Sequence, residues 1–359
     1  MKKSFKHTLV MLMAIVFAFS TSSCDDWTDT ESIDLNNPTI DEQNPQLYED
    51  YLENLRAYKA GDHNVLFVSF DNAEGSPSKQ AERLTAIPDS VDYVCLNNPD
   101  NLHADLLAEM DKVRKDKSTG IVYSISYDNI EADWQEKVKE NPALTEEEGL
   151  EYMGEQIDLL LKLSDKYNYD GIVVDYTGRS LVSLVPAELD KYNARQQNLL
   201  NRIQAWKEAN ATKKLVFYGN VQYLVPENMN MLNKCDYIMI KSAASTNADD
   251  LSLKIYLAIQ AGKDGLPEEG GINPVPTDRF MACVQLPQAD DKDKIIGYWN
   301  PQASDTDKIV AALGASQWVV QYSPDFSRKG LFVMNIHNDY YNNTYEYIRN
   351  VIRIMNPNK

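Results

Sequence analysis

The strongest constraint on the fold of this sequence is a series of eight short apolar runs that begins at residue 65. The runs are rich in Val, Ile and Leu and are continuous rather than alternating, which is typical of parallel strands covered by helices. They are Val65–Phe70, Val91–Leu96, Ile121–Tyr127, Ile172–Tyr176, Leu215–Tyr218, Tyr237–Ile240, Phe280–Leu286 and Leu331–Ile336. Eight strands joined by mostly helical crossovers predict the α/β class and a (β/α)8 TIM barrel, built as a single domain over residues 45–359.

Helical patterns lie before and between these runs. They cover Pro45–Lys59, Leu102–Lys115, Pro186–Glu208, Asp250–Ala261, Thr306–Ala315 and Tyr345–Ile354, with a short crossover at Pro226–Asn233. Ser76 and Pro77 predict a further helix start, and Thr145 with Glu148 predicts a capping box. The alternative fold is an open doubly wound sheet, which requires a Gly-rich phosphate-binding turn after an early strand. Residues 69–76 contain no such turn.

The charge of the chain restricts its partners. The formal net charge is -19, and removal of Met1–Ser23, which holds three lysines and no acid, makes it -22. So acidic a body repels nucleic acid and anionic lipid headgroups, so neither is an expected partner. It suits a neutral ligand such as a sugar.

The N-terminus predicts export and a lipid anchor. Residues 1–23 have a lysine-bearing start followed by the apolar segment Leu9–Phe19, which is too short to span a membrane. The small residues before Cys24 resemble a bacterial lipoprotein lipobox, which implies acylation of Cys24. The acidic segment 24–44 predicts a flexible tether and is similar to the surface-export signal of Bacteroidetes lipoproteins. We therefore expect attachment to the outer membrane at the cell surface, with the lipid anchor as the only membrane contact.

The fourth predicted strand carries the clearest candidate for chemistry. Within Tyr169–Gly178, Asp175 shares one face with Val173 and Thr177, whereas Tyr176 lies on the other face. A carboxylate at the C-terminal end of a parallel strand is where α/β barrels place their reactive groups. The alternative is a structural Asp175 that bonds to backbone or to a neighbour such as Lys241.

This strand resembles glycoside hydrolase family 18, which contains chitinases and endo-β-N-acetylglucosaminidases. The family carries D-G-x-D-x-D-x-E on strand four, and Asp170, Gly171 and Asp175 match it. Val173 replaces the middle Asp and Thr177 replaces the Glu. The resemblance implies catalysis assisted by the substrate's acetamido group, with the Glu as proton donor, and a threonine hydroxyl does not titrate in a useful range.

The sixth strand departs from the family in the same direction. Asp236–Ala243 has the frame of the endoglycosidase strand, but Ala243 stands where that branch has a Tyr. These three replacements predict a barrel that kept its cleft and lost its chemistry. The resemblance then implies a non-catalytic protein that binds N-acetylglucosamine-containing oligosaccharides such as N-glycans and passes them to an outer-membrane importer.

Two other functions stay open. One is an active endo-β-N-acetylglucosaminidase in which Asp339 or Asp128 supplies the acid, and the other is an assembly component that binds a neighbouring protein. The candidate ligand-binding residues are polar or aromatic and lie mainly at strand ends: Asp71, Tyr127, Asp175, Tyr176, Thr177, Tyr218, Asn220, Lys241, Gln285, Trp299, Asn335, His337 and Tyr340.

The remaining aromatic and metal-binding residue types give structural predictions. Trp299 is either an exposed stacking platform or a buried loop anchor, and Trp134 has the same two alternatives. Trp206 and Trp318 are expected in the core. His337 has no second ligand at metal spacing, and the cysteines show no CxxC pattern, so we expect no metal, no cofactor, and three buried thiols at Cys95, Cys235 and Cys283.

Overall fold

The computed structural model describes residues 39–267 and 271–357, and the chain divides into two compact units, 1–50 and 51–359. The predicted signal peptide, the Cys24 anchor and the tether as far as residue 38 lie outside the described residues. Helix α2 (Ile40–Gln43) falls in the last part of the predicted tether. Among the helices of the described residues, none is both long and apolar enough to cross a membrane.

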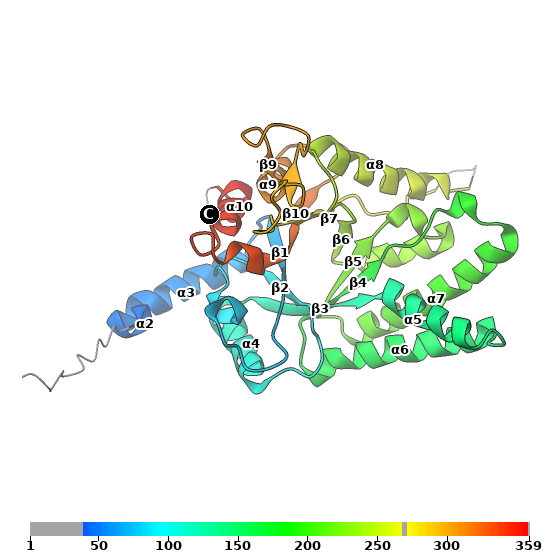
Figure 1. Cartoon of the computed structure of the whole chain (residues 1–359), viewed down its shortest axis with the longest axis horizontal. Coiled ribbons are helices and arrows are strands. Elements are labelled where there is room, and N and C mark those ends of the chain that lie inside the picture. The colour runs from blue at the N-terminus through cyan, green and yellow to red at the C-terminus, as the bar shows by residue number, and fades with distance from the viewer. Residues whose placement is uncertain (1–38, 268–270, 358–359) are drawn as a thin grey trace, which may run out of the picture. The chain divides into compact units, whose positions relative to one another are not determined.

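The second unit is a closed barrel of eight parallel strands (Figure 1). Around the barrel the order is β1 (Val65–Phe70), β10 (Arg328–Met334), β7 (Phe280–Gln285), β6 (Tyr237–Ile240), β5 (Lys214–Gly219), β4 (Gly171–Tyr176), β3 (Gly120–Ser126) and β2 (Tyr93–Leu96). Pairing of β1 with β10 closes it. The predicted (β/α)8 barrel is therefore confirmed, and each of the eight predicted runs overlaps one of the barrel strands.

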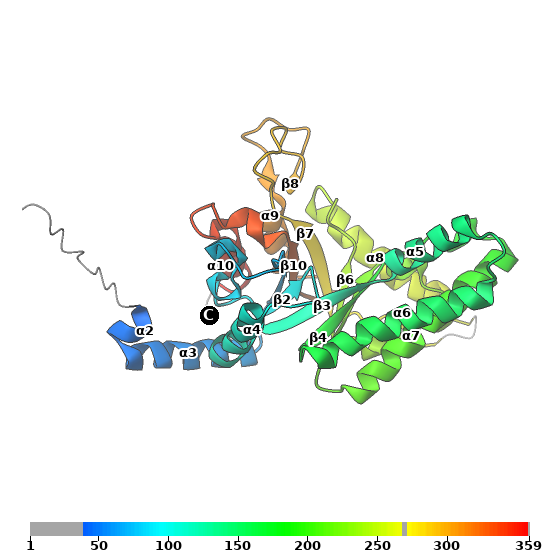
Figure 2. The same ribbon diagram turned by 60° about the horizontal axis from the view of Figure 1, so that its bottom comes forward.

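Helices surround the strands, and α6 and α7 lie side by side (Figures 1 and 2). These helices are α4 (Ala104–Lys117), α5 (Tyr127–Glu140), α6 (Glu146–Lys166), α7 (Pro186–Ala209), α8 (Ala248–Asp264), α9 (Ala311–Val319) and α10 (Glu346–Met355). Helix α3 (Pro45–Ala60) precedes β1 and spans the boundary between the two units. The predicted capping box is present, because Thr145 Oγ1 accepts from Glu148 N and Glu148 accepts from Thr145 N.

Two crossovers differ from the prediction. The helix expected at Ser76 and Pro77 is absent, and residues 71–92, all of them described, hold only the 3-10 helices Gln80–Glu82 and Leu84–Ala86. Ser76 instead donates to Asp105 Oδ2, so its hydroxyl is used in a tertiary contact rather than as a cap. Helix α9 begins at Ala311 rather than Thr306, because a two-stranded excursion occupies the preceding residues.

Alternate strand residues fill the barrel interior, as a packed TIM-barrel core requires. The buried interior residues are Val65, Phe67, Cys95, Val122, Val173, Val216, Tyr218, Met239, Met281, Cys283 and Phe332. All three cysteines of the described residues are buried free thiols, as predicted. The barrel closes over Gly330, whose φ is 143° and whose added Cβ would lie 1.8 Å from the Val65 carbonyl oxygen.

In the first six strands, one Asp carboxylate links the N-terminal ends of each successive pair: β1 with β2, β3 with β4, and β5 with β6. The Asp immediately before an even-numbered strand accepts a hydrogen bond from a backbone N–H of the preceding strand: Asp92 from Leu66 (2.8 Å), Asp170 from Ile121 (2.7 Å) and Asp236 from Leu215 (2.9 Å). Basic side chains lie against these carboxylates: His63 on Asp92, Arg114 on Asp170, and Lys207 with Lys214 on Asp236. This end of the barrel is therefore fixed by ionic groups.

The excursion between β7 and α9 anchors a tryptophan. Strands β8 (Tyr298–Trp299) and β9 (Ile309–Val310) pair antiparallel in a segment that stands beyond β7 (Figure 2). Trp299 is 5% exposed, and an added Cβ on Gly314 would lie 2.4 Å from its ring. Of the two alternatives for Trp299, the structure therefore shows the buried loop anchor. Trp134 is buried as well, and the core positions of Trp206 and Trp318 are confirmed.

Candidate functional site at the barrel mouth

Polar side chains gather at the C-terminal ends of β4, β5 and β6, and we call this group the mouth site. It consists of Asp128, Asp175, Thr177, Tyr218, Asn220 and Lys241. The strand register explains the gathering, because Asp175 pairs with Ser126 of β3 on one side and with Tyr218 of β5 on the other. Residues of equal height on neighbouring parallel strands point to the same side of the sheet.

An ion pair occupies the centre of the mouth site. Lys241 Nζ contacts Asp175 Oδ1, and the side chains are each 22% exposed. The same ammonium lies 4.4 Å from the centroid of the Tyr218 ring, in a cation–π contact. Of the two roles predicted for Asp175, the pairing with Lys241 is thus the one that the structure displays.

Burial sets the electrostatics of this pair. It raises the pKa of Asp175 above its ordinary value, Lys241 opposes that rise, and the charge of Asp128 adds to it. Burial also raises the pKa of Tyr218, so the phenol is neutral in the physiological range. The mouth therefore offers a carboxylate, an ammonium and a phenol, each able to exchange hydrogen bonds with sugar hydroxyl or amide groups.

The loop after β4 completes the group through its backbone. Thr177 N donates to Asp128 Oδ1 at 3.4 Å, and Asn220 Nδ2 donates to the Thr177 carbonyl at 3.0 Å. Thr177 is thus held between a carboxylate from α5 and an amide that follows β5. Asp128 was predicted only as a rival acid, and the structure places it in the mouth site.

Two predicted ligand-binding residues lie away from the mouth. Tyr176 is 1% exposed and accepts a hydrogen bond from Gln196 of α7, on the outer face of β4. Tyr127 is 3% exposed, and its hydroxyl contacts Met153 Sδ. The sequence predicted a strand that extends to Tyr127, but β3 ends at Ser126. Tyr127 is the first residue of α5, and its ring is buried in the core. Neither side chain can contact a ligand at the mouth, nor can the buried Trp299.

The other predicted site residues follow β1, β7 and β10. Asp71 is exposed directly after β1, and Gln285 ends β7 on the inward side with Met281 and Cys283. After β10, Asn335 takes a left-handed conformation (φ 62°) and its N–H donates to Ser69 Oγ. His337 is half-buried, and Tyr340 packs its ring against Tyr341 and Tyr345. Among the described residues, no hydrogen bond, ion pair or ring contact joins any of these side chains to the mouth site.

Sequence reasoning missed two inward serines on β3. Ser124 and Ser126 alternate with the buried Val122 and are partly exposed, so they follow the interior face toward the mouth. Strict alternation from Val122 is the signal that finds them.

The second rival acid has a structural role. Asp339 is 1% exposed, and its carboxylate accepts hydrogen bonds from the backbone N–H groups of Tyr347 and Ile348 and from Asn342. It therefore fixes the start of α10 and does not reach the mouth. The prediction that Asp339 supplies an acid is wrong for this structure.

Metal binding finds no support in the described part of the chain. Within residues 39–267 and 271–357, no group of three or more His, Cys, Asp or Glu side chains is arranged to hold a metal ion. The expectation of no metal and no cofactor stays a prediction.

Comparison with known proteins gives one family and a set of similar folds. The model of glycoside hydrolase family 18, BT1044-like, matches residues 28–354. A solved structure of selenomethionine BT1044 with a glutamate-to-glutamine substitution is 17% identical, covers 89% of this chain and 96% of its own, and has a TM-score of 0.59. A search of curated proteins finds no match.

Chitinases are among the other similar structures. A family GH18 chitinase from Chromobacterium violaceum is 12% identical over 82% of this chain and 84% of its own, with a TM-score of 0.46. A class V chitinase mutant from Cycas revoluta in complex with (GlcNAc)3 is 10% identical over 81% of this chain and 98% of its own, with a TM-score of 0.48.

Proposed function

This chain belongs to glycoside hydrolase family 18, in its BT1044-like group, and from that membership we propose that it binds N-acetylglucosamine-containing oligosaccharides such as N-glycans without cleaving them. The observation that carries the proposal is the composition of the mouth site. Thr177 occupies the position of the proton donor, and Asp175 is engaged by Lys241. A site so built retains donors and acceptors for sugar groups but lacks the titratable acid at the required position.

The ion pair also argues against the family's mechanism at Asp175. Substrate-assisted cleavage needs this carboxylate to orient the acetamido group and to stabilise the oxazolinium that forms. Here Oδ1 is buried, and within the described residues it accepts no hydrogen bond apart from its contact with Lys241. A ligand amide would have to compete with the ammonium for this carboxylate, which suits reversible binding better than stabilisation of a developing cation.

The expected cellular setting completes the proposal. We infer that acylation of Cys24 holds the protein at the cell surface, where it captures glycans for an outer-membrane importer. The lipobox-like residues before Cys24 support this inference. Incorporation of labelled palmitate into the wild type, and its loss in Cys24→Ala, tests it; equal labelling of both proteins would contradict it.

A glycan array followed by calorimetry with a core N-glycan tests the binding. We expect saturable binding by the wild type and a loss of about tenfold or more in Asp175→Ala, because a charged hydrogen-bond partner is removed. Asp133→Asn is the matched control, since Asp133 is exposed on α5. Absence of binding to every glycan, or equal binding by Asp175→Ala, would contradict the proposal.

A second function is favoured by the position of Asp128. Its carboxylate lies against the backbone of Thr177, so it is the remaining candidate for a displaced acid. Incubation with an N-glycoprotein, followed by mass spectrometry of released glycans, separates the two functions. Sustained release that disappears in Asp128→Asn but persists in Asp133→Asn would establish an active endoglycosidase.

A further inference from the structure

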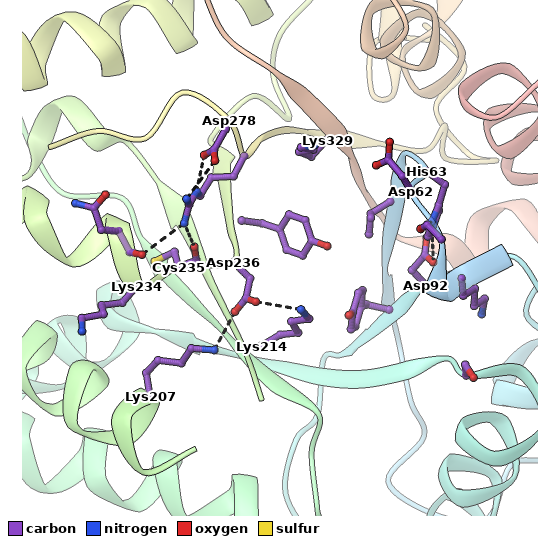
Figure 3. Close-up of a pocket in the computed structure, with 18 residues that line it drawn as sticks. Asp62, His63, Asp92, Lys207, Lys214, Lys234, Cys235, Asp236, Asp278 and Lys329 are labelled. Carbon is purple, nitrogen blue, oxygen red and sulfur yellow. Dashed lines mark hydrogen bonds and ion pairs between the residues drawn. The ribbon is translucent and has the colours of Figure 1, made fainter. Parts of the chain in front are cut away.

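A second hollow opens at the opposite end of the barrel from the mouth site. It has a volume of about 630 Å³ and is lined by residues at the starts of β1, β2, β5, β6, β7 and β10 (Figure 3). Tyr93 and Tyr237 line it, and both rings pack on Phe67 of the barrel interior, at centroid distances of 4.4 Å and 5.6 Å. The barrel interior is filled at this level, so the hollow is a closed-bottomed basin.

The charge of this basin is opposite to that of the chain. Four acids line it: Asp62, Asp92, Asp236 and Asp278. Six cations line it: Lys59, Lys207, Lys214, Lys234, Arg279 and Lys329. With His63 neutral, the lining therefore has an excess of two positive charges in a protein whose formal net charge is -19. An electropositive concavity within a negative surface concentrates anions locally.

Three of the four acids of the basin are already occupied by the fold, and the fourth, Asp62, is exposed at its rim. Asp92 and Asp236 accept backbone N–H groups at strand starts, and Asp278 binds Arg279 through both carboxylate oxygens. These carboxylates offer little to a cationic ligand. The lining therefore offers a ligand more hydrogen-bond donors than acceptors.

Two of the lysines retain donor capacity. Lys214 Nζ has Asp236 Oδ1 as its partner at 3.0 Å, which leaves two of its three hydrogens for other acceptors. Lys329 has neither a hydrogen bond nor an ion pair within the described residues. Figure 3 shows the two lysines on different sides of the hollow, with Asp236 and Lys207 to one side and His63 and Asp92 to the other.

We propose that this basin binds a small polyanion, a molecule with two or more phosphate or sulfate groups, through Lys214 and Lys329. Lys214 of β5 and Lys329 of β10 lie on different sides of the hollow (Figure 3), so a ligand with more than one anionic group is the kind that can engage both, and a volume of about 630 Å³ accommodates a small molecule. Tyr93 and Tyr237, which also line the hollow, carry phenol groups that can act as neutral donors. This site is independent of glycan binding at the mouth.

Calorimetry with tripolyphosphate at low ionic strength tests the proposal. We expect one saturable site in the wild type and a loss of affinity of about tenfold in Lys329→Gln, because a charge-assisted hydrogen bond is removed. Lys329→Gln breaks no hydrogen bond or ion pair among the described residues and removes only a longer-range attraction to Asp278, so its melting temperature should stay close to that of the wild type. Lys292→Gln, in the exposed loop after β7, is the control and should bind within twofold of the wild type.

The remaining titrations decide the alternatives. Lys214→Gln should weaken binding as well, and its melting temperature reports any loss from the freed Asp236. Inorganic phosphate should bind more weakly than tripolyphosphate if two contact points are needed. Absence of saturable binding by the wild type, equal affinity in Lys329→Gln, or equal losses in Lys292→Gln would overturn the proposal.

Discussion

Separation of Asp175 from Lys241 is expected to destabilise the protein in a pH-dependent way. The two side chains are in contact and each is 22% exposed, which places the pair between exposed pairs, worth about 0–1 kcal/mol, and fully buried pairs, whose disruption costs about 3–5 kcal/mol. We therefore expect Lys241→Met to lower the free energy of unfolding by about 2 kcal/mol at neutral pH. The loss arises because the half-buried Asp175 would lose the cation that stabilises its charge.

The sign of the pH dependence follows from the raised pKa of Asp175. Burial raises it already, and loss of Lys241 would raise it further. A carboxyl whose folded pKa exceeds its unfolded value stabilises the fold at low pH, and this contribution is lost as the pH rises through the folded pKa. The difference between the wild type and Lys241→Met should therefore be small near pH 4 and should grow as the pH increases above it.

Urea unfolding followed by tryptophan fluorescence measures these differences. A double-mutant cycle with Lys241→Met and Asp175→Asn should give a coupling energy of about 1–3 kcal/mol. Lys162→Met, on the exposed face of α6, is the control and should lie within about 0.5 kcal/mol of the wild type. A coupling energy below about 0.5 kcal/mol, or a loss independent of pH, would refute the reasoning.

Three further predictions concern the scaffold. Gly330→Ala should lower the free energy of unfolding by about 3 kcal/mol or more, since its Cβ would lie 1.8 Å from the Val65 carbonyl; unchanged urea stability would contradict this. Burial lowers the pKa of Lys59 to about 8 from an ordinary 10.5, so between about pH 7.5 and about pH 9.5 the stability of the wild type should rise by about 2 kcal/mol relative to Lys59→Met, measured by urea unfolding. Trp299→Ala should cost about 3–5 kcal/mol, because the indole is buried against Gly314; a thermal shift within 1 °C of the wild type would contradict that packing.

The sequence predicted the barrel because its signals are local. Each strand of a covered parallel sheet is a continuous apolar run, and the Thr145 capping box needs only residues three apart. The failures depend on tertiary context. Ser76 is a good cap by composition, but its hydroxyl bonds to Asp105 on α4, and an isolated loop tryptophan such as Trp299 gives no sign of the helix that covers it.

The mouth site was predictable in part for the same reason. Alternation placed Asp175 on the inward face, and the ends of neighbouring strands brought Tyr218 and Lys241 to it. Tyr127 was misplaced because a polar aromatic residue at a strand end suggests a mouth position. Alternation from Val122 assigns Tyr127 to the outer face with Tyr123 and Ile125, and its ring packs in the core where α5 begins.

The motif on strand four that resembles the family's has two parts: residues at the start of the strand that make packing contacts within the barrel, and residues at its C-terminal end where the family places its reactive groups. Asp170 bonds Ile121 N and Arg114 at the strand start, and an added Cβ on Gly171 would lie 2.4 Å from the Lys214 carbonyl oxygen. Both retained residues are therefore explained by strand packing, whether or not any reaction occurs.

The residues at the far end of the strand carry the functional information. There, the acid position is Thr177, and the one retained carboxylate, Asp175, has a cation as its partner. A half-buried carboxylate is tolerated only if some other group stabilises its charge, and Lys241 supplies that stabilisation to Asp175. The presence of Asp175 is therefore compatible with a binding role. Asp175→Asn keeps the shape of the side chain and removes its charge. Glycan affinity measured in this variant separates a role in binding from a purely structural pairing with Lys241.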